Sequence, residues 1–287
     1  MERLSDDENW VRMGGLSRRA ALSGGAAALG YALAAQPVAA SAITTPADGL
    51  DAGWLEFPAG DGFSMRAYRA RPRGAKNAPL LIVVQEIFGV HEWIQDVTRR
   101  FALHGFHAIA PDLFQRYGDA TKVTDIKTLR ETIISRVSDA QVMADLDALV
   151  PFGVKDGGDA KKLGITGFCW GGRITWLYAA HSPRLFAGVA WYGRLVGEPS
   201  AINPRHPIDA VTELKAPVLG LYGTQDRGIP VEDVKRMNAA LAAAGKRGEI
   251  RLFEADHGFL ADYRPSFSES AAKAAWPMAV DWLRKGR

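Results

Sequence analysis

The stretch that decides the fold is residues 163–176, which reads LGITGFCWGGRITW. Its apolar first half, Leu163 to Phe168, has the composition of a buried β-strand, and a helical pattern begins after Gly171 and Gly172. Cys169 lies between Gly167 and Gly171, which is the spacing G-x-nucleophile-x-G of a nucleophile elbow. The flanking glycines suit a strained turn, because a Cβ at either position would crowd the adjoining strand or helix. The stretch therefore predicts a strand, a sharp turn that carries Cys169, and a helix.

A cysteine in this position has the surroundings of a reactive thiol. The unpaired N–H groups and the dipole of a helix N-terminus favour a thiolate and can bind a developing oxyanion. Cys169 is the only cysteine in the chain, which excludes an intrachain disulfide. A lone cysteine without this context is more often a small buried apolar residue, so a catalytic role for Cys169 depends on partner residues elsewhere in the chain.

The composition is that of a globular chain with room for one α/β domain. The 287 residues are 47% hydrophobic, with 35 basic and 32 acidic side chains. The near balance of charge and the absence of a long basic run argue against a nucleic-acid partner. The histidines other than His257 lack metal-ligand spacing with cysteine or carboxylate, so we expect no metal site, and nothing in the sequence calls for a cofactor.

The first 42 residues have the outline of a twin-arginine export signal. Residues 17–22 read SRRAAL, a weakly apolar segment rich in Ala and Gly follows, and residues 40–42 read ASA, a small-x-small cleavage site. Ala21 and Ser23 stand where Phe and Lys are common in such signals. We expect the export machinery to deliver the protein to the periplasm, with cleavage after Ala42 and no stable membrane insertion, because the apolar run is short and broken by glycines. A disordered tail or a retained anchor is the alternative, and without a functional signal the protein stays in the cytoplasm.

Residues 43–287 are expected to form a single domain in which strands alternate with helices. The first two strands, 53–58 and 64–71, predict an antiparallel hairpin at the sheet edge. Continuous apolar runs predict further strands at 80–84, 106–110, 163–168, 188–192, 218–222 and 250–253. Helical spacing occurs at 94–103, 128–150, 231–244 and 270–284, and 194–213 is expected to be a surface connection. This order predicts an α/β fold with a mostly parallel sheet and helices on both faces.

Polar residues follow four of these strands, at the edge where active sites of open parallel sheets lie. They are Glu86, Cys169, Asp226 and His257. A cysteine, an acid 57 residues later (226 − 169) and a histidine 31 residues further on (257 − 226) occur in the nucleophile, acid, base order of α/β-hydrolases. His257 would take the thiol proton, and Asp226 would fix the imidazole tautomer. Considered alone, Asp226 is also typical of a turn, and His257 is also typical of a loop. Asp256, next to His257, is an alternative to Asp226 as the acid.

The sequence resembles the dienelactone hydrolase family (carboxymethylenebutenolidase-like) over about residues 50–285. The resemblance rests on five motifs: QEIFG at 85–89, APDLF at 110–114, GFCWGG at 167–172, WYG at 191–193 and DHGF at 256–259. It implies an α/β-hydrolase fold with about eight strands and a Cys-His-Asp triad made of Cys169, His257 and Asp226. It also implies a thioester acyl-enzyme and an enol-lactone substrate that carries a carboxylate.

The resemblance also implies roles for residues around the triad. Glu86 would contact the thiol and control when it becomes a thiolate, and the N–H groups of Ile87 and Trp170 would form the oxyanion hole. Arg116 matches the family arginine that binds the substrate carboxylate, for which a bidentate guanidinium is well suited. The best-known members have a second arginine four residues after the histidine. This chain has Ala261 there, and Arg264 is the candidate replacement.

These expectations describe an exported, cofactor-independent cysteine hydrolase of a small carboxylate-bearing lactone or ester. Two alternatives stay open. The first is a general periplasmic carboxylesterase or lactonase, for which Arg116 would be dispensable. The second is a metabolite-binding protein on the same fold, which would bind its ligand without turnover.

Overall fold

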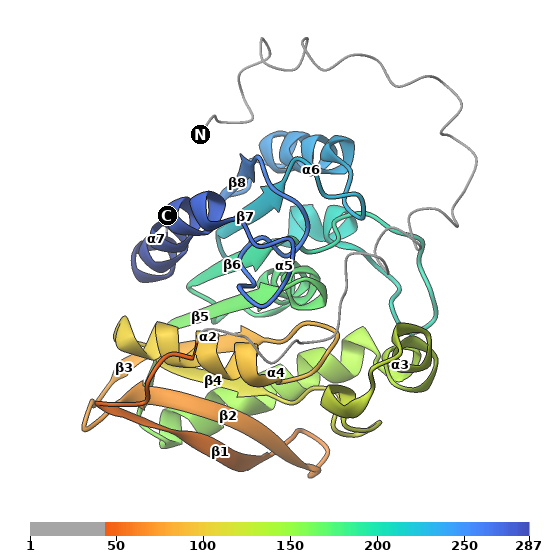
Figure 1. The fold of residues 1–287 in the computed structure, drawn as a ribbon. Helices are drawn as coiled ribbons and strands as arrows, with labels where there is room; N and C mark the ends of the chain where they lie inside the picture. The colour runs from red at the N-terminus through yellow and green to blue at the C-terminus, as the bar shows by residue number, and fades with distance from the viewer. Residues whose placement is uncertain (1–43, 287) are drawn as a thin grey trace.

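A twisted eight-stranded sheet runs through the middle of the computed structural model, which describes residues 44–286 (Figure 1). Its spatial order is β1-β2-β4-β3-β5-β6-β7-β8. The strands are β1 Leu50–Pro58, β2 Ser64–Pro72, β3 Ala78–Val84, β4 His107–Pro111, β5 Gly158–Phe168, β6 Ala187–Trp191, β7 Val218–Gly223 and β8 Gly248–Phe253. Strands β1 and β2 pair antiparallel from Leu50↔Pro72 to Pro58↔Ser64, and β2 is antiparallel to β4. All other neighbours are parallel, which confirms the edge hairpin and the mostly parallel sheet.

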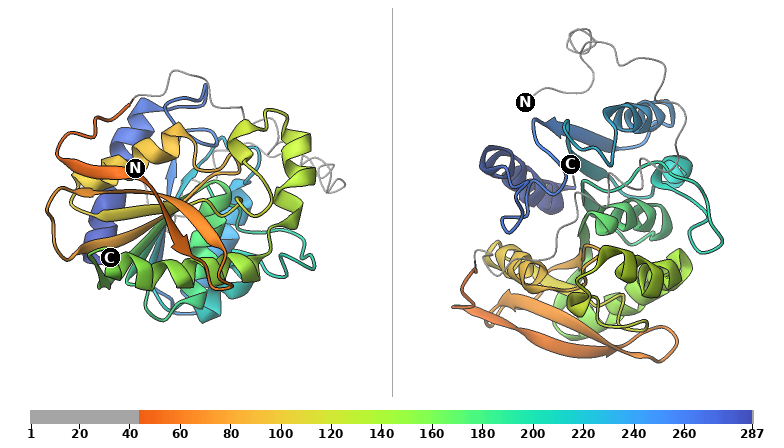
Figure 2. Two further views of the ribbon diagram at one scale, coloured as in Figure 1. Left: turned by 90° about the horizontal axis from the view of Figure 1, so that it is seen from below. Right: turned by 45° about the vertical axis from the view of Figure 1, so that its right-hand side comes forward.

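Helices cover both faces of the sheet, which is why its central strands are apolar throughout. All five residues of β4 and of β6 are buried. The helices are α2 Glu92–Leu103, α3 Ile126–Thr132, α4 Asp139–Lys155, α5 Trp170–His181, α6 Val231–Ala243 and α7 Glu269–Lys285, with 3₁₀ turns η2 Ala120–Lys122, η3 Ile134–Arg136 and η4 Pro207–Glu213. Figure 2 shows α2 and α7 on one side of the sheet and α4, α5 and α6 on the other. The core therefore consists of two layers, one on each face of the sheet.

The expected single helix over 128–150 is wrong, because capping side chains divide this segment. Asp125 accepts a hydrogen bond from the Thr128 N–H and begins α3, and Ser138 accepts one from the Gln141 N–H and begins α4. Between them Ile133 has φ −118° and ψ −65°, and η3 follows. The segment is therefore two helices joined by a short turn.

Strand β5 begins at Gly158, five residues before the predicted start at Leu163. Its polar first part pairs with β3 through Ala78↔Gly158 and Pro79↔Asp159 before a shift of register. The expected surface connection 194–213 is irregular except for η4 near its end.

The predicted export signal, residues 1–42, lies outside the described residues. Within residues 44–286, no helix combines the length and the apolar character that a membrane span requires.

Candidate active site

Cys169 occupies a strained turn between the last residue of β5 and the first residue of α5. Its backbone has φ 57° and ψ −114°, a conformation that L-residues rarely adopt. A Cβ on Gly167 would lie 2.1 Å from the carbonyl oxygen of Gly171, and one on Gly171 would lie 2.4 Å from that of Val84. Both positions admit only glycine, so the predicted strand, strained turn and helix around Cys169 are confirmed.

Asp226 and His257 meet at the carboxyl ends of β7 and β8, beside the elbow. The Nδ1 atom of His257 lies 2.7 Å from Oδ2 of Asp226, and the two side chains are each 1% exposed. The other oxygen of Asp226 accepts hydrogen bonds from the N–H groups of Gly228 at 2.8 Å and Ile229 at 3.0 Å. The carboxylate is thus fixed on both sides, and it fixes the imidazole in turn.

The competing acid, Asp256, has a different partner. Its Oδ1 accepts a hydrogen bond from the backbone N–H of His257 at 2.6 Å, which shapes the loop after β8. Asp226 is therefore the acid that contacts the imidazole.

Cys169 acts on His257 electrostatically. Burial opposes a charge on the imidazole, but Asp226 and Cys169 outweigh it through their charges and hydrogen bonds and raise the pKa of His257 to about 10. Asp226 and Cys169 therefore favour the protonated form of the imidazole. Cys169 is only 1% exposed, so a substrate has to be admitted to a dry site.

Glu86, two residues after the end of β3, is the centre of a second buried cluster. Its Oε1 accepts a hydrogen bond from Nη2 of Arg264 at 2.8 Å, and its Oε2 accepts one from the Tyr263 hydroxyl at 2.6 Å. The Nε2 atom of His91 lies 3.1 Å from the same Oε2. Burial alone would raise the pKa of Glu86, but Arg264, His91 and Tyr263 together lower it to about 2. Both oxygens of this carboxylate are therefore bonded to residues other than Cys169.

Arg264 lies close enough to Cys169 for their charges to interact. Burial opposes its charge, while Glu86, Tyr263 and Cys169 raise its pKa above the ordinary value. Its aliphatic part packs on the histidine loop, where a Cβ on Gly258 would lie 2.9 Å from its Cδ. Arg264 thus links Glu86 to the surroundings of the triad, although the sequence predicted it as a substrate-binding residue.

Arg116 is held by two carboxylates, one of them in the turn between β1 and β2. Its guanidinium bonds to Asp61 at 2.9 and 3.0 Å and to Asp145 of α4 at 2.7 Å. It also lies over the ring of Phe63, with its Cζ 4.3 Å from the ring centroid. The printed contacts of Arg116 are therefore with Asp61, Asp145 and Phe63, and its expected role in binding the substrate carboxylate stays a prediction.

Comparisons with known proteins identify the family of this chain. The model of the dienelactone hydrolase family matches residues 65–286. The chain belongs to the dienelactone hydrolase family. The family places it among the hydrolases of ester and lactone bonds on an α/β-hydrolase fold, as the sequence predicted.

Named relatives of this family cover nearly the whole chain. A protein of Methylorubrum extorquens named "Putative carboxymethylenebutenolidase" is 53% identical over 273 residues, 94% of this chain and 93% of that protein. A Salmonella typhimurium protein of the same name is 52% identical over 256 residues, 88% of this chain and 94% of that protein. The crystal structure described as a putative dienelactone hydrolase from Klebsiella pneumoniae is 52% identical, has a TM-score of 0.80, and covers 82% of this chain and 99% of its own.

Three residues beside this dienelactone hydrolase site were not predicted from the sequence. His91 and Tyr263 hold Glu86, and Tyr192 packs its ring edge-on against His257 with 5.1 Å between centroids. Tyr192 is fully buried with φ 38°, and within residues 44–286 its hydroxyl has no hydrogen-bond partner. Tyr192 directly follows β6, so the strand-end argument that selected Cys169 and Asp226 could also have selected Tyr192.

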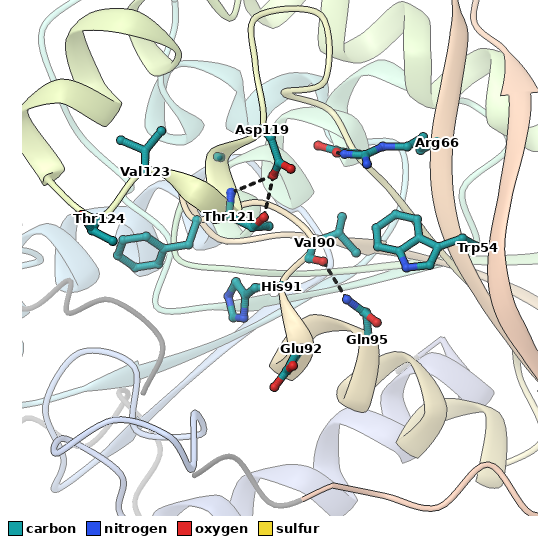
Figure 3. Close-up of a pocket in the computed structure, with 13 residues that line it drawn as sticks. Trp54, Arg66, Val90, His91, Glu92, Gln95, Asp119, Thr121, Val123 and Thr124 are labelled. Carbon is teal, nitrogen blue, oxygen red and sulfur yellow. Dashed lines mark hydrogen bonds and ion pairs between the residues drawn. The ribbon is translucent and has the colours of Figure 1, made fainter. Parts of the chain in front are cut away.

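Two pockets border the site. One of about 250 Å³ is lined in part by Ile87 and Trp170, the residues expected to supply the oxyanion hole. Trp170 is the first residue of α5, so its N–H has no acceptor within the helix. The other pocket, of about 430 Å³, has Trp54, Arg66 and His91 on its wall (Figure 3). Among residues 44–286 no cluster of three or more His, Cys, Asp or Glu side chains could hold a metal ion.

Proposed function

We propose that this protein hydrolyses a small enol-lactone or ester that carries a carboxylate, by way of a thioester on Cys169. The arrangement that carries the proposal is the Asp226–His257 pair of 2.7 Å beside a strained cysteine at a helix N-terminus. The name of the relatives, carboxymethylenebutenolidase, denotes a lactonase whose substrate bears a carboxymethylene group. Both the site and these names indicate hydrolysis of a lactone or ester bond.

In the first half of the reaction the sulfur of Cys169 attacks the lactone carbonyl. His257, whose pKa is raised by Asp226 and Cys169, receives the thiol proton as the sulfur attacks. The carbonyl oxygen becomes an oxyanion, which the N–H groups of Ile87 and Trp170 would stabilise. The carbon–oxygen bond of the ring then breaks, and the departing enolate oxygen takes the proton from His257. The product is a thioester and a neutral imidazole.

In the second half His257 changes from acid to base. The sulfur charge that helps to raise the pKa of His257 is lost when the thioester forms. The neutral imidazole, still oriented by Asp226, removes a proton from water, and the hydroxide formed attacks the thioester carbonyl. The carbon–sulfur bond breaks, the carboxylic acid product leaves, and the sulfur returns as a thiolate beside a protonated imidazole.

Glu86 would adjust this chemistry through Arg264. In the free site its negative charge is neutralised by Arg264 at 2.8 Å. An anionic substrate that attracts Arg264 would weaken this ion pair and change the charge that acts on the sulfur. Substrate binding and thiol reactivity would then be coupled, as the resemblance implies.

The experiment that tests the function is turnover of a carboxylated enol-lactone against simple aryl esters by the purified protein. The expected result is a higher kcat/KM for the lactone, with activity lost in Cys169→Ala. Binding of the lactone without any turnover would instead support a metabolite-binding protein.

A general carboxylesterase or lactonase is the second candidate, because Arg116 is engaged by Asp61 and Asp145. Equal kcat/KM for esters with and without a carboxylate would favour it. For either activity we propose that the twin-arginine motif at residues 17–22 directs the enzyme to the periplasm.

A further inference from the structure

The side chain of Tyr192 ends in a buried hydroxyl group that has no partner in the described chain. The residue is fully buried, and within residues 44–286 no atom accepts from or donates to its hydroxyl. Burying a hydroxyl in this way is unfavourable, because its hydrogen bonds with water are lost and not replaced. A phenylalanine would have the same ring without this disadvantage. The hydroxyl is therefore best explained by a partner that arrives with the substrate.

The other buried tyrosines show how such a hydroxyl is normally accommodated. Each of them bonds to another side chain, at distances of 2.6 to 3.1 Å; they are Tyr68, Tyr178, Tyr222 and Tyr263. The hydroxyl of Tyr222, for example, accepts a hydrogen bond from Nε1 of Trp176 at 3.0 Å. Tyr192 is thus the exception among the buried tyrosines of residues 44–286.

The backbone holds Tyr192 in a strained conformation at the carboxyl end of β6. Its φ is 38°, a value that is unfavourable for a residue with a bulky side chain. The preceding carbonyl oxygen, that of Trp191, accepts a hydrogen bond from the N–H of Cys169 at 3.0 Å, and the N–H of Tyr192 donates to Leu221 of β7 at 2.9 Å. Tyr192 is therefore fixed directly to the turn that carries Cys169. Strain that neighbouring bonds maintain is concentrated at functional sites.

The surroundings of Tyr192 make its hydroxyl a hydrogen-bond donor beside the catalytic imidazole. The ring meets that of His257 edge to face, with 5.1 Å between centroids and 62° between the planes. Burial raises the pKa of Tyr192 well above its ordinary value, and the charges of Glu86 and Cys169 raise it further. The hydroxyl therefore keeps its proton at every pH at which the enzyme would work, and it is available to donate to an anionic oxygen.

We propose that the Tyr192 hydroxyl donates a hydrogen bond to the leaving oxygen of the substrate, the atom that takes the proton from His257. The inference rests on the hydrolase function proposed above. As the carbon–oxygen bond breaks, negative charge develops on this oxygen, and a donor already in place stabilises it. Tyr192 keeps its own proton throughout, and the proton that neutralises the leaving oxygen comes from His257. The N–H groups of Ile87 and Trp170 would act on the other oxygen, that of the carbonyl.

The test compares phenyl acetate with para-nitrophenyl acetate, because their leaving oxygens differ in how much stabilisation they need. The nitro group spreads the negative charge over the ring, so this ester depends less on a donor. In Tyr192→Phe we expect kcat/KM for phenyl acetate to fall about 10- to 100-fold, as for loss of a hydrogen bond to a charged group, and kcat/KM for para-nitrophenyl acetate to fall less than about 3-fold. The Tm of this variant should be unchanged or higher, since the hydroxyl without a partner is removed.

Tyr222→Phe is the matched control, because it removes a buried hydroxyl that has a partner, Nε1 of Trp176. This variant should have a lower Tm, and the ratio of its two kcat/KM values should equal that of the unsubstituted protein. A further measurement is the pH dependence of the alkylation of Cys169 by iodoacetamide. It should be the same in Tyr192→Phe and in the unsubstituted protein, because the hydroxyl acts on the substrate and not on the sulfur.

Three results would each overturn the inference. The first is an equal loss, or no loss, of kcat/KM for the two esters in Tyr192→Phe. The second is a lower Tm in this variant, which would make the hydroxyl a structural group. The third is a shifted pH dependence of alkylation, which would show that Tyr192 acts on the thiol. Failure of the hydrolase function itself is distinguishable, since the unsubstituted protein would then turn over neither ester, and the inference would fall with it.

Discussion

Arg264 and Glu86 form an ion pair of 2.8 Å in which the two side chains are 1% and 0% exposed. The residues are 178 positions apart in the chain. The pair joins the loop after β8, which carries His257, to the loop after β3, which carries Ile87. A buried pair of this kind contributes to the position of both loops, because neither charge can be left alone in the interior.

Glu86→Gln should lower the stability of the protein at neutral pH by about 3 kcal/mol, because Arg264 loses its buried counter-charge. The pKa of Glu86 is lowered from 4.5 to about 2, so the unfolded chain binds its proton first. The stabilisation by the carboxylate is therefore complete above pH 4.5 and is lost as the pH falls toward about 2. Urea unfolding of both proteins at several pH values measures this difference. A stability gap that is as large at pH 3 as at pH 7 would contradict the assignment.

Cys169→Ala should remove all turnover, because no other thiol is present to form the thioester. The fold should survive, since the elbow is shaped by Gly167 and Gly171 and not by the sulfur. Cys169→Ser should be slow but measurable, because a hydroxyl gives up its proton less readily than a thiol. Steady-state kinetics and circular dichroism of the two variants check these outcomes, and retained hydrolysis in Cys169→Ala would exclude Cys169 as the nucleophile.

Asp226→Asn should reduce kcat by about 10³- to 10⁴-fold, as in other triads that lose the carboxylate. The amide oxygen can still accept from the N–H groups of Gly228 and Ile229, so the loop is expected to remain in place. The pKa of His257 should fall, because Asp226 is one of the groups that raise it. NMR titration of the imidazole measures this shift. Asp256→Asn is the control, and a loss of kcat equal to that of Asp226→Asn would assign the acid differently.

Gly171→Ala should destabilise the protein by about 3 kcal/mol, since its Cβ would lie 2.4 Å from the Val84 carbonyl oxygen and 2.6 Å from that of Gln85. Backbone atoms cannot move aside as a flexible side chain can. Gly53→Ala in β1 is the matched control, because a Cβ at Gly53 has no atom within 4 Å. Thermal unfolding compares the two, and similar losses for both would show that crowding is not the cause.

Replacing Arg18 and Arg19 with lysines should prevent export if residues 1–42 are a twin-arginine signal. The unaltered protein should be recovered from the periplasm as a chain that begins at Ile43, shortened by cleavage after Ala42. Cell fractionation and mass spectrometry of the N-terminus measure this. An unaltered protein that stays in the cytoplasm at full length would show that the segment is not a signal.

The fold and the contact between Asp226 and His257 could be predicted because their signals are local. Apolar runs identified the parallel strands, and the candidate residues Cys169, Asp226 and His257 were selected because each follows the end of a strand. The confirmed strained turn likewise depends on glycines within three positions of Cys169. Such features need only a short piece of chain to be recognised.

The partners of Arg116 and Arg264 could not be predicted, because they come from distant parts of the chain. Arg116 bonds to Asp61, 55 residues earlier, and to Asp145, 29 residues later. Arg264 bonds to Glu86, and nothing near either residue indicates this pairing. The division of 128–150 into two helices was missed for a different reason: a single Ser138 begins α4, and its capping bond is weaker as a signal than the apolar spacing around it.

Because the single cysteine is also the proposed nucleophile, this protein has no second thiol to absorb oxidative damage. One equivalent of oxidant that reaches Cys169 would inactivate one molecule, and no intramolecular disulfide could form to protect the sulfur from further oxidation. Because there is only one thiol, the intact active centres in a preparation can be counted directly. The number of titratable thiols per molecule, measured under denaturing conditions, equals the fraction of intact active centres.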